Sequence, residues 1–261
     1  MHKYFSVERT QMSTTVFLAG ATGAIGRQLV PLLIKAGYRV FGTTRLEERA
    51  GHLREVGVEP VVLDVFDSSA VETAFMRIKP EILIHQLTDL PKDLSPEAMV
   101  EGKVRNARVW NEGTGNLIRA AKKAGTRRAI AQSLAWLYAP GPVPHREEDL
   151  LGVVDPELRI VVEAASSLEH AVLDSPPIQG VVLRYGLLYG PGTSSEEPVG
   201  PCVVHVQAAA NAAVLAIERG APGVYNVVDD NTFASNERAR RALGWNPAFR
   251  RREILSLGQH P

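Results

Sequence analysis

Short apolar runs alternate with longer amphipathic segments along most of the chain. Runs rich in Val, Ile, Leu and Phe predict buried β-strands at residues 16–19, 38–45, 60–65, 81–87, 128–133 and 180–186. Between them, apolar residues that recur every three to four positions predict helices beginning near residue 25 and at 46–56, 68–78, 98–124 and 156–174. Alternating strands and helices predict parallel βαβ units, and the handedness of such connections arranges them as a doubly wound α/β sheet.

The remainder of the chain, after the turn Gly190-Pro191-Gly192, is less regular. It predicts an alanine-rich helix at 206–219, a strand at 224–228 and a short basic helix at 235–243. Because so few residues remain, we expect a small, truncated cap on the core and not a second domain. We therefore predict one domain over 1–261, with a loose N-terminal extension at 1–13, a core at 14–190 and a reduced substrate cap at 191–261.

Charge balance and cysteine content narrow the range of partners. Lys plus Arg and Asp plus Glu each number 29, which gives no reason to expect nucleic acid or an anionic membrane surface. No apolar run reaches the ~18 residues that cross a bilayer, and the first residues lack an apolar signal segment. The single cysteine, Cys202, fits a reducing compartment, and no His, Cys, Asp or Glu spacing suggests a metal site. These features predict a cytoplasmic protein without membrane, nucleic-acid or metal partners.

Three glycines, spaced three residues apart, follow the first predicted strand. Gly20 would allow a tight turn, Gly23 would let a pyrophosphate approach the backbone, and Gly26 would let the next helix pack closely on the strand. Free N–H groups at the helix start would hold the phosphates. A turn without ligand is the alternative, but three glycines cost conformational entropy that a mere turn does not require. The pattern therefore predicts a Rossmann-type dinucleotide site, with contacts from Gly20, Thr22, Gly23, Ala24, Ile25 and Gly26.

The end of the second predicted strand indicates which dinucleotide binds. An acidic residue there would hydrogen-bond the ribose 2′-hydroxyl of NAD(H), whereas an arginine would pair with the 2′-phosphate of NADP(H). The chain has Arg45 at this point, with Arg49 one turn further along. Arg45 could instead be a solvated side chain at a helix start, although its charge would there face the unfavourable end of the helix dipole. We predict NADP(H) as the cofactor, with NAD(H) less favoured.

Four segments together resemble the extended short-chain dehydrogenase/reductase superfamily, in its NAD-dependent epimerase/dehydratase group: residues 19–26, 63–65, 111–117 and 183–192. The resemblance runs over about residues 15–192. It implies that Asp64 accepts a hydrogen bond from the adenine amino group, with Val65 beside the base. It also implies that Leu87 and Thr88 line the cofactor channel, and that Asn111 ties the long helix to the neighbouring strand.

The resemblance fails at the catalytic positions. Enzymes of this superfamily use a Ser/Thr–Tyr–Lys set, in which the lysine lowers the pKa of a tyrosine four residues before it. Glu169 resembles the acidic residue that usually follows the lysine, and counting back from it places Val161 and Ala165 at the tyrosine and lysine positions. No Tyr-x-x-x-Lys occurs anywhere in the chain, whatever the alignment.

Other side chains could supply a proton in place of the missing pair. Ser133 ends the fifth predicted strand, where a substrate contact and a role in capping the loop are about equally expected. Tyr138 could donate a proton, although a packing role is favoured, and Tyr185 and Tyr189 are further candidates of similar weakness. We name Ser133 and Tyr138 as catalytic candidates. His85 is expected to be a hydrogen-bonded histidine near the core and not a base.

Two functions remain open. The first is an NADP(H)-binding oxidoreductase or epimerase/dehydratase-like enzyme that transfers hydride to or from a carbonyl or hydroxyl group of a small-molecule substrate. The reduced cap favours a small substrate, because it buries less of a ligand. The alternative is a non-catalytic NADP(H)-binding protein that senses redox state for a partner. By the same resemblance, the long helix and the helix before the sixth strand could form the interface of a homodimer.

Overall fold

A seven-stranded parallel sheet forms the centre of the molecule, in the order β3-β2-β1-β4-β5-β6-β9. The computed structural model describes residues 13–91 and 94–251. The strands are β1 Thr15–Ala19, β2 Arg39–Thr44, β3 Glu59–Val62, β4 Ile82–His85, β5 Arg128–Leu134, β6 Gln179–Tyr185 and β9 Gly223–Val227. The order reverses direction between β1 and β4, which confirms the predicted doubly wound α/β fold and creates a ligand crevice beyond the carboxyl ends of the strands.

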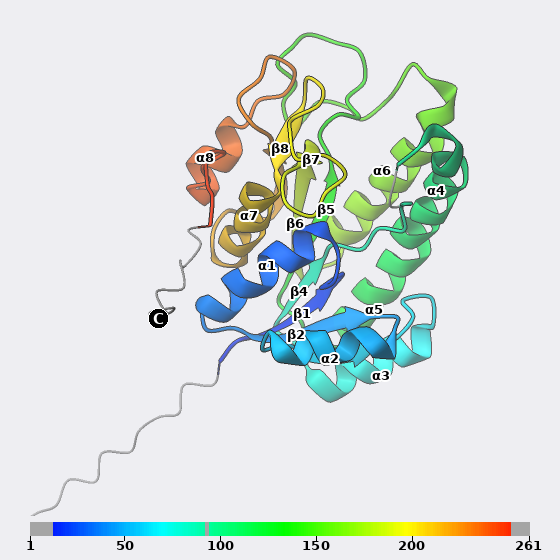
Figure 1. Ribbon diagram of the computed structural model, residues 1–261, viewed down its shortest axis with the longest axis vertical. Helices are drawn as coiled ribbons and strands as arrows, with labels where there is room; N and C mark the ends of the chain where they lie inside the picture. The colour runs from blue at the N-terminus through cyan, green and yellow to red at the C-terminus, as the bar shows by residue number, and fades with distance from the viewer. Residues whose placement is uncertain (1–12, 92–93, 252–261) are drawn as a thin grey trace, which may run out of the picture.

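Helices cover both faces of this sheet (Figure 1). One face carries α1 (Ala24–Lys35), α2 (Glu47–Glu55), α7 (Val206–Glu218) and α8 (Glu237–Leu243). The other face carries α3 (Ser68–Ile78), α4 (Pro96–Arg108), α5 (Thr114–Ala124) and α6 (Arg159–Leu173). A short 3₁₀ turn, Pro156–Leu158, precedes α6.

The alternation of side chains along β1 builds the two halves of the core. Val16 and Leu18 point into the cluster beneath α1 and α7, whereas Phe17 and Ala19 point into the cluster beneath α3, α5 and α6. All four side chains are completely buried. Because successive residues of a strand face opposite sides, a strand covered on both faces has to be apolar throughout.

The predicted helix at 98–124 is interrupted. A five-residue π-helical segment, Val109–Gly113, separates α4 from α5. It brings Gly113 against Val65, where a Cβ atom would approach the valine side chain to 3.1 Å. Such segments often lie at functional sites, and this one borders the crevice.

The C-terminal residues add to the same core. The alanines of α7 are buried against α1, and the indole of Trp245 donates a hydrogen bond to the carbonyl of Ala208 at 2.8 Å. A second parallel sheet, β7 (Leu187–Tyr189) with β8 (Val203–His205), was not expected from the sequence. The first twelve residues lie outside the described part, so the predicted extension is not tested there. None of the described helices has the length and apolar character needed to cross a membrane.

Candidate functional site

The glycine turn between β1 and α1 depends on its three glycines in different ways. Gly20 has φ of +95°, and a Cβ atom there would lie 2.6 Å from the carbonyl oxygen of Gln86. A Cβ atom on Gly26 would lie 2.1 Å from the carbonyl oxygen of Gly20. At Gly23 a Cβ atom would meet only the Gly20 carbonyl oxygen, at an ordinary 3.4 Å. The fold itself therefore requires Gly20 and Gly26, while the exposed Gly23 leaves room for a ligand.

The start of α1 offers its backbone N–H groups to this space. Gly23 is the N-cap and has no side chain to bond them, and the first turn carries no acidic residue. The turn is closed by Gly23 N–H donating to the carbonyl of Gly20 at 3.1 Å. A twelve-residue helix with an uncapped N-terminus favours an anion such as a phosphate at this point.

A cavity of about 320 Å³ lies over the turn, at the carboxyl ends of β1, β2, β3 and β4. Its walls include most of the residues predicted to bind the dinucleotide: Gly20, Thr22, Gly23, Arg45, Asp64, Val65, Leu87 and Thr88. Ala24, Ile25 and Gly26 form the first turn of α1 and do not line the cavity. Ile25 and Gly26 are buried there. The structure thus brings the predicted cofactor residues together, and their binding roles stay predictions.

The wall beyond β2 carries two arginines. Arg45 and Arg49 both border the cavity, and the side chain of Arg45 is 61% exposed. Arg45 Nη1 lies 3.6 Å from a carboxylate oxygen of Asp89, which follows β4. The hydroxyl of Thr43 accepts a hydrogen bond from Gly20 N–H at 3.1 Å and so ties β2 to the glycine turn. This wall holds a cation that can turn toward an anionic ligand.

The opposite wall is held by the helix pair α4 and α5. Asn116 Nδ2 donates to the carbonyl of Val65 at 2.9 Å, and Trp110 Nε1 donates to the carbonyl of Leu87 at 3.2 Å. Asn111, expected to make such a tie, is exposed on the helix surface instead. That expectation was wrong, because the π-helical segment turns the indole of Trp110 toward β4.

His85 ends β4 and is structural. Leu87 N–H donates to its Nδ1 at 3.2 Å, so its Nε2 carries the proton and faces the hydroxyl of Thr114 at 2.9 Å. Complete burial lowers the pKa of His85 to about 4. The ring is therefore neutral at ordinary pH, and it joins β4 to α5 away from the cavity, as its expected near-core role requires.

Ser133 and Tyr138, the two catalytic candidates, belong to one buried polar network and do not line the cavity. The hydroxyl of Ser133 donates to Glu169 Oε1 at 2.6 Å. Glu169 also receives two hydrogen bonds from Arg184, at 2.9 and 2.7 Å. Arg184 Nη1 donates to the Tyr138 hydroxyl at 2.9 Å, and that hydroxyl donates to Asn226 Oδ1 at 2.7 Å.

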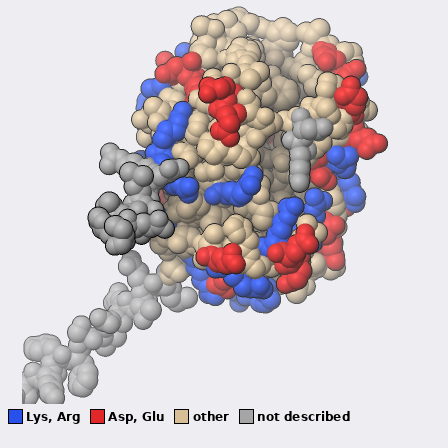
Figure 2. Space-filling model, viewed as in Figure 1, with Lys and Arg blue, Asp and Glu red and all other residues tan. Residues whose placement is uncertain are grey.

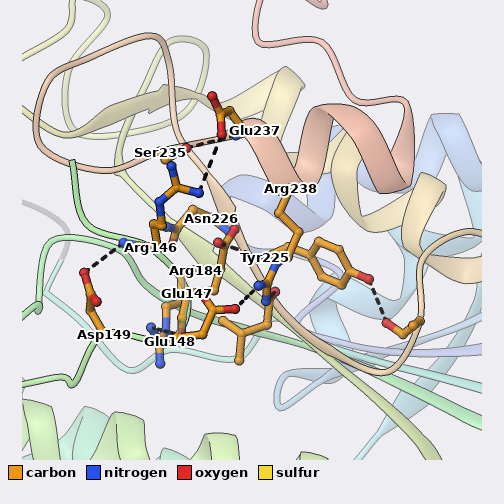
Figure 3. Close-up of polar contacts among 12 residues, drawn as sticks. Arg146, Glu147, Glu148, Asp149, Arg184, Tyr225, Asn226, Ser235, Glu237 and Arg238 are labelled. Atoms are coloured by element: carbon orange, nitrogen blue, oxygen red, sulfur yellow. Dashed lines mark hydrogen bonds and ion pairs between the residues drawn. The ribbon is translucent and has the colours of Figure 1, made fainter. Parts of the chain in front are cut away.

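The same network attaches the loop after β5 to the C-terminal part of the chain (Figure 3). Glu147 accepts a hydrogen bond from Asn226 N–H at 2.9 Å, and its other carboxylate oxygen lies 3.6 Å from Arg238 Nε of α8. Arg238 also binds Glu148. The ring of His145 stacks on Tyr138 with centroids 4.9 Å apart. Sequence reasoning missed this network, because its members lie far apart in the chain.

Val161 and Ala165, which the sequence predicts at the tyrosine and lysine positions of the resembled enzymes, lie on the buried face of α6. Both belong to the apolar cluster that contains Trp110 and Leu137, and Leu87 packs against it. No acid or base takes their place on this face of α6: its other buried residues are Ala164, Leu168 and Val172, together with the paired Glu169.

Comparison with known proteins gives matches over most of the chain. Residues 16–205 match the model of a family described as "NAD dependent epimerase/dehydratase family". A 3-diazoavenalumate denitrifying reductase from a Streptomyces species is 33% identical, covering 89% of this chain and 95% of that relative. A dTDP-4-dehydrorhamnose reductase from Streptomyces griseus is 30% identical over 67% of this chain and 50% of its own length.

Solved structures share the fold at low identity. A UDP-glucose 4-epimerase from Thermotoga maritima, solved with UDP-glucose, has a TM-score of 0.74 and 19% identity, covering 90% of this chain and 94% of its own. A short-chain dehydrogenase/reductase superfamily protein from Agrobacterium tumefaciens, solved with bound NAD, has a TM-score of 0.72 and 18% identity, covering 90% of this chain and 93% of its own.

The alignment to the first Streptomyces relative spans 299 positions, more than the 261 residues of this chain, so this chain lacks segments that the relative has.

Proposed function

The chain belongs to the NAD-dependent epimerase/dehydratase family as an NAD(P)-binding, oxidoreductase- or epimerase-like enzyme, and from this premise we propose that it is an NADPH-dependent reductase of small organic molecules. The observation that carries the proposal is the cavity over the glycine turn, with Arg45 on its wall. The non-catalytic alternative is not favoured, since the relatives are reductases and epimerases.

Arg45 and Arg49 support NADPH over NADH. The end of β2 carries no carboxylate that would hydrogen-bond a free ribose 2′-hydroxyl; the residues there are Thr43, Thr44 and Arg45. A planar guanidinium pairs well with a phosphate. Asp89, whose carboxylate lies 3.6 Å from Arg45 Nη1, is the partner that a bound 2′-phosphate would replace.

Each wall of the cavity has a distinct task in this proposal. The N–H groups at the start of α1 bind the pyrophosphate, and Gly23 gives it access to the backbone. Asp64 and Val65 receive the adenine, and Leu87 with Thr88 continue the channel toward β5. When bound, the nicotinamide supplies hydride. The buried apolar face of α6 keeps water from the reacting atoms.

The roles of Ser133 and Tyr138 are proposed to be positional. Both hydroxyl protons are already donated, to Glu169 and Asn226, inside a network that fixes β5, β6 and the loop after β5. Burial also raises the pKa of Tyr138, which makes its phenol a poorer acid. Their catalytic roles remain predictions, which Ser133→Ala and Tyr138→Phe test.

The relatives suggest reduction as the direction of reaction. The name of the Streptomyces relative describes the removal of nitrogen from a diazo compound, and that of the second relative describes a carbonyl substrate. The reduced C-terminal part of this chain supports a small substrate, because a short cap encloses less of a ligand. A cytoplasmic location is proposed from the single, buried Cys202, which fits a reducing compartment.

A homodimer through α4 and α6 is proposed from exposed apolar side chains. Val100 and Val104 on α4 are 63% and 56% exposed, and Ile160 is 36% exposed on α6, the helix that packs against α4. Light scattering after gel filtration should give twice the chain mass, and Val104→Glu should halve it. Val199→Glu, on the loop after β7, is the matched control that should leave the mass unchanged.

Thermal-shift titration tests the cofactor assignment. NADPH at 100 times its Kd should stabilise the fold by about 2.7 kcal/mol, and NADH at the same concentration should stabilise it less. A melting temperature that neither nucleotide changes would contradict the proposal.

A further inference from the structure

The second turn of α1 is tied to the loop that follows β7 (Figure 1). Arg27 Nη2 donates a hydrogen bond to the carbonyl of Gly192 at 3.1 Å, and Gln28 Nε2 donates to the carbonyl of Pro191 at 3.3 Å. Two neighbouring side chains of one helix thus hold two successive peptide groups of one turn. The contact joins the helix that follows the glycine turn to the loop beyond the carboxyl end of β6.

This loop is shaped to receive the guanidinium of Arg27. Gly192 has φ of +79°, and a Cβ atom there would lie 3.1 Å from Arg27 Nη2 and 3.5 Å from its Cζ. A residue without a side chain both adopts this backbone conformation and leaves room for the guanidinium. The loop is also braced from within, because Gly190 N–H donates to the carbonyl of Ser195 at 2.8 Å and Thr193 N–H donates to the carbonyl of Gly190 at 3.1 Å. It is therefore a compact unit that Arg27 holds at one point.

The charge of Arg27 has no counter-ion among the residues that the structure describes. Its exposed side chain donates to a neutral carbonyl, and no described carboxylate pairs with it. The other basic residue of α1 is Lys35, at the opposite end of the helix. Figure 2 shows Lys and Arg side chains across the middle of the visible face, where α1 lies in Figure 1, below a mostly uncharged surface with patches of Asp and Glu. A cation near the start of a helix is unfavourable by itself, so an anion beside it is stabilising.

The backbone of α1 directs this guanidinium toward the proposed pyrophosphate site. Arg27 N–H donates to the carbonyl of Gly23 at 3.0 Å, so the two residues lie one turn apart on the same side of the helix. Long side chains in a helix point back toward its N-terminus and cover the preceding turn. The side chain of Arg27 therefore reaches toward the free N–H groups at the start of α1.

Arg27 and the two arginines of the cavity lie on opposite sides of these N–H groups. Arg45 and Arg49 line the cavity beyond β2, whereas Arg27 does not line it and contacts the loop that follows β7. In the sheet, β2 and β6 lie on opposite sides of the pair β1 and β4. Since the adenosine half of the proposed cofactor occupies the β2 side, the phosphate of its nicotinamide half falls on the side of Arg27.

We infer that Arg27 binds the phosphate of the cofactor's nicotinamide half and links it to the loop after β7, so that cofactor binding fixes this loop at the carboxyl end of β6. This inference rests on the NADPH site proposed above. A guanidinium carries five N–H donors, so it can keep the Gly192 carbonyl and donate to a phosphate oxygen at the same time. Arg27 is then a cofactor-binding residue that the glycine pattern alone does not reveal.

Binding of two nucleotides tests this placement. Adenosine 2′,5′-bisphosphate carries the 2′-phosphate and the adenosine-side phosphate but lacks the nicotinamide half. Arg27→Met keeps most of the apolar stem and removes the charge. It should weaken NADPH binding about tenfold or more, as the loss of a hydrogen bond to a charged group predicts, and change bisphosphate binding less than about twofold. Arg27→Lys should recover part of the NADPH affinity.

The matched control is Lys35→Met, which removes the same charge from the far end of α1 and should leave both dissociation constants unchanged. Fluorescence titration gives these constants, and the melting temperature without ligand shows that each variant is folded. Hydrogen exchange then tests the link to the loop. NADPH should slow exchange of the amides in residues 190–202 of the wild type, and should slow it less in Arg27→Met when both proteins are saturated.

The possible results separate the inference from the proposed function. Unchanged NADPH affinity in Arg27→Met would overturn the inference and leave the proposed cofactor site in place. An equal loss for NADPH and the bisphosphate would place Arg27 on the adenosine side and overturn it as well. The same protection of the loop in both saturated proteins would contradict the link between cofactor and loop. A wild type that binds neither nucleotide would overturn the proposed NADPH site itself.

Discussion

The hydroxyl of Ser133 donates a hydrogen bond to Glu169 Oε1 at 2.6 Å, at the point where β5 meets α6. Glu169 is at the same time the partner of Arg184, and both charged side chains are almost completely buried. This hydroxyl, for which the sequence left a substrate contact and a loop-capping role equally open, is thereby part of a buried polar network. Tyr138, in the loop after β5, belongs to the same network, because Arg184 donates a hydrogen bond to its hydroxyl.

Removal of these two hydroxyls should affect stability more than turnover. Ser133→Ala leaves a buried carboxylate with one hydrogen bond fewer, which costs about 1.5–3 kcal/mol of unfolding free energy. Tyr138→Phe should cost a similar amount, because Asn226 and Arg184 both lose a partner. Urea unfolding and NADPH oxidation are measured on each variant, with Tyr38→Phe as a control that loses a more exposed hydrogen bond to Glu218. Loss of turnover at unchanged stability would instead make the hydroxyl catalytic.

The glycine turn allows ligand binding to be separated from folding. Gly26→Ala places a Cβ atom 2.1 Å from the carbonyl oxygen of Gly20, so this variant should be strongly destabilised or fail to fold. Gly23→Ala adds a Cβ atom at an ordinary 3.4 Å and with φ of −74°, so its stability without ligand should fall by no more than about 1 kcal/mol, the cost of alanine at an N-cap. Its NADPH affinity should fall by tenfold or more, because the methyl group occupies the path of the pyrophosphate. Calorimetric titration that found unchanged affinity would show that the nucleotide does not approach this turn.

Arg45 should set the preference between the two nucleotides. Arg45→Asp should weaken NADPH binding by more than tenfold while NADH binding changes little, since only NADPH carries the 2′-phosphate. Arg54→Asp makes the same charge change on α2 but lies outside the cavity wall, and it is the matched control. Fluorescence titration of both nucleotides gives the two dissociation constants. An equal loss for NADPH and NADH would contradict the assignment.

His85 should make stability depend on pH. Its pKa is about 4 in the folded protein, because burial disfavours the charged ring, and near 6.5 in the unfolded chain. The unfolded chain therefore binds the proton first, and the contribution of His85 to stability is complete above pH ~6.5 and is lost as pH falls through about 4. The full difference corresponds to about 3 kcal/mol.

Urea unfolding of His85→Gln between pH 4 and 7 checks this expectation. The variant should lose less stability on acidification than the wild type. His52→Gln, on the exposed surface of α2, should follow the wild type. Parallel curves for the wild type and His85→Gln would contradict a buried neutral ring.

The parts of this fold that the sequence predicts are those carried by local patterns. Apolar runs located all seven strands of the main sheet to within two or three residues, because strands buried on both faces have to be apolar throughout. Eight of the residues predicted to bind the dinucleotide also line one cavity, since the carboxyl ends of neighbouring parallel strands meet at one edge, whereas the predicted Ala24, Ile25 and Gly26 do not line it.

Features that depend on distant contacts were not foreseen. The π-helical segment Val109–Gly113 has no periodic signal of its own, and its effect was to bring Trp110 and not Asn111 to β4. Strands β7 and β8 have three residues each and pair across a long loop. The network around Arg184 joins β5, α6, β6, β9 and α8, which no local pattern reports.

A crystal structure of the complex with NADPH tests the central claim most directly. We predict the pyrophosphate at the N–H groups of α1 and the 2′-phosphate on Arg45. The reactive end of the nicotinamide should lie beside Val161 and Ala165. No tyrosine or lysine should be close enough to donate a hydrogen bond to a substrate bound at C4 of the nicotinamide. A nucleotide bound elsewhere, or one whose 2′-phosphate points away from Arg45 while a side-chain proton donor approaches the nicotinamide, would contradict this account.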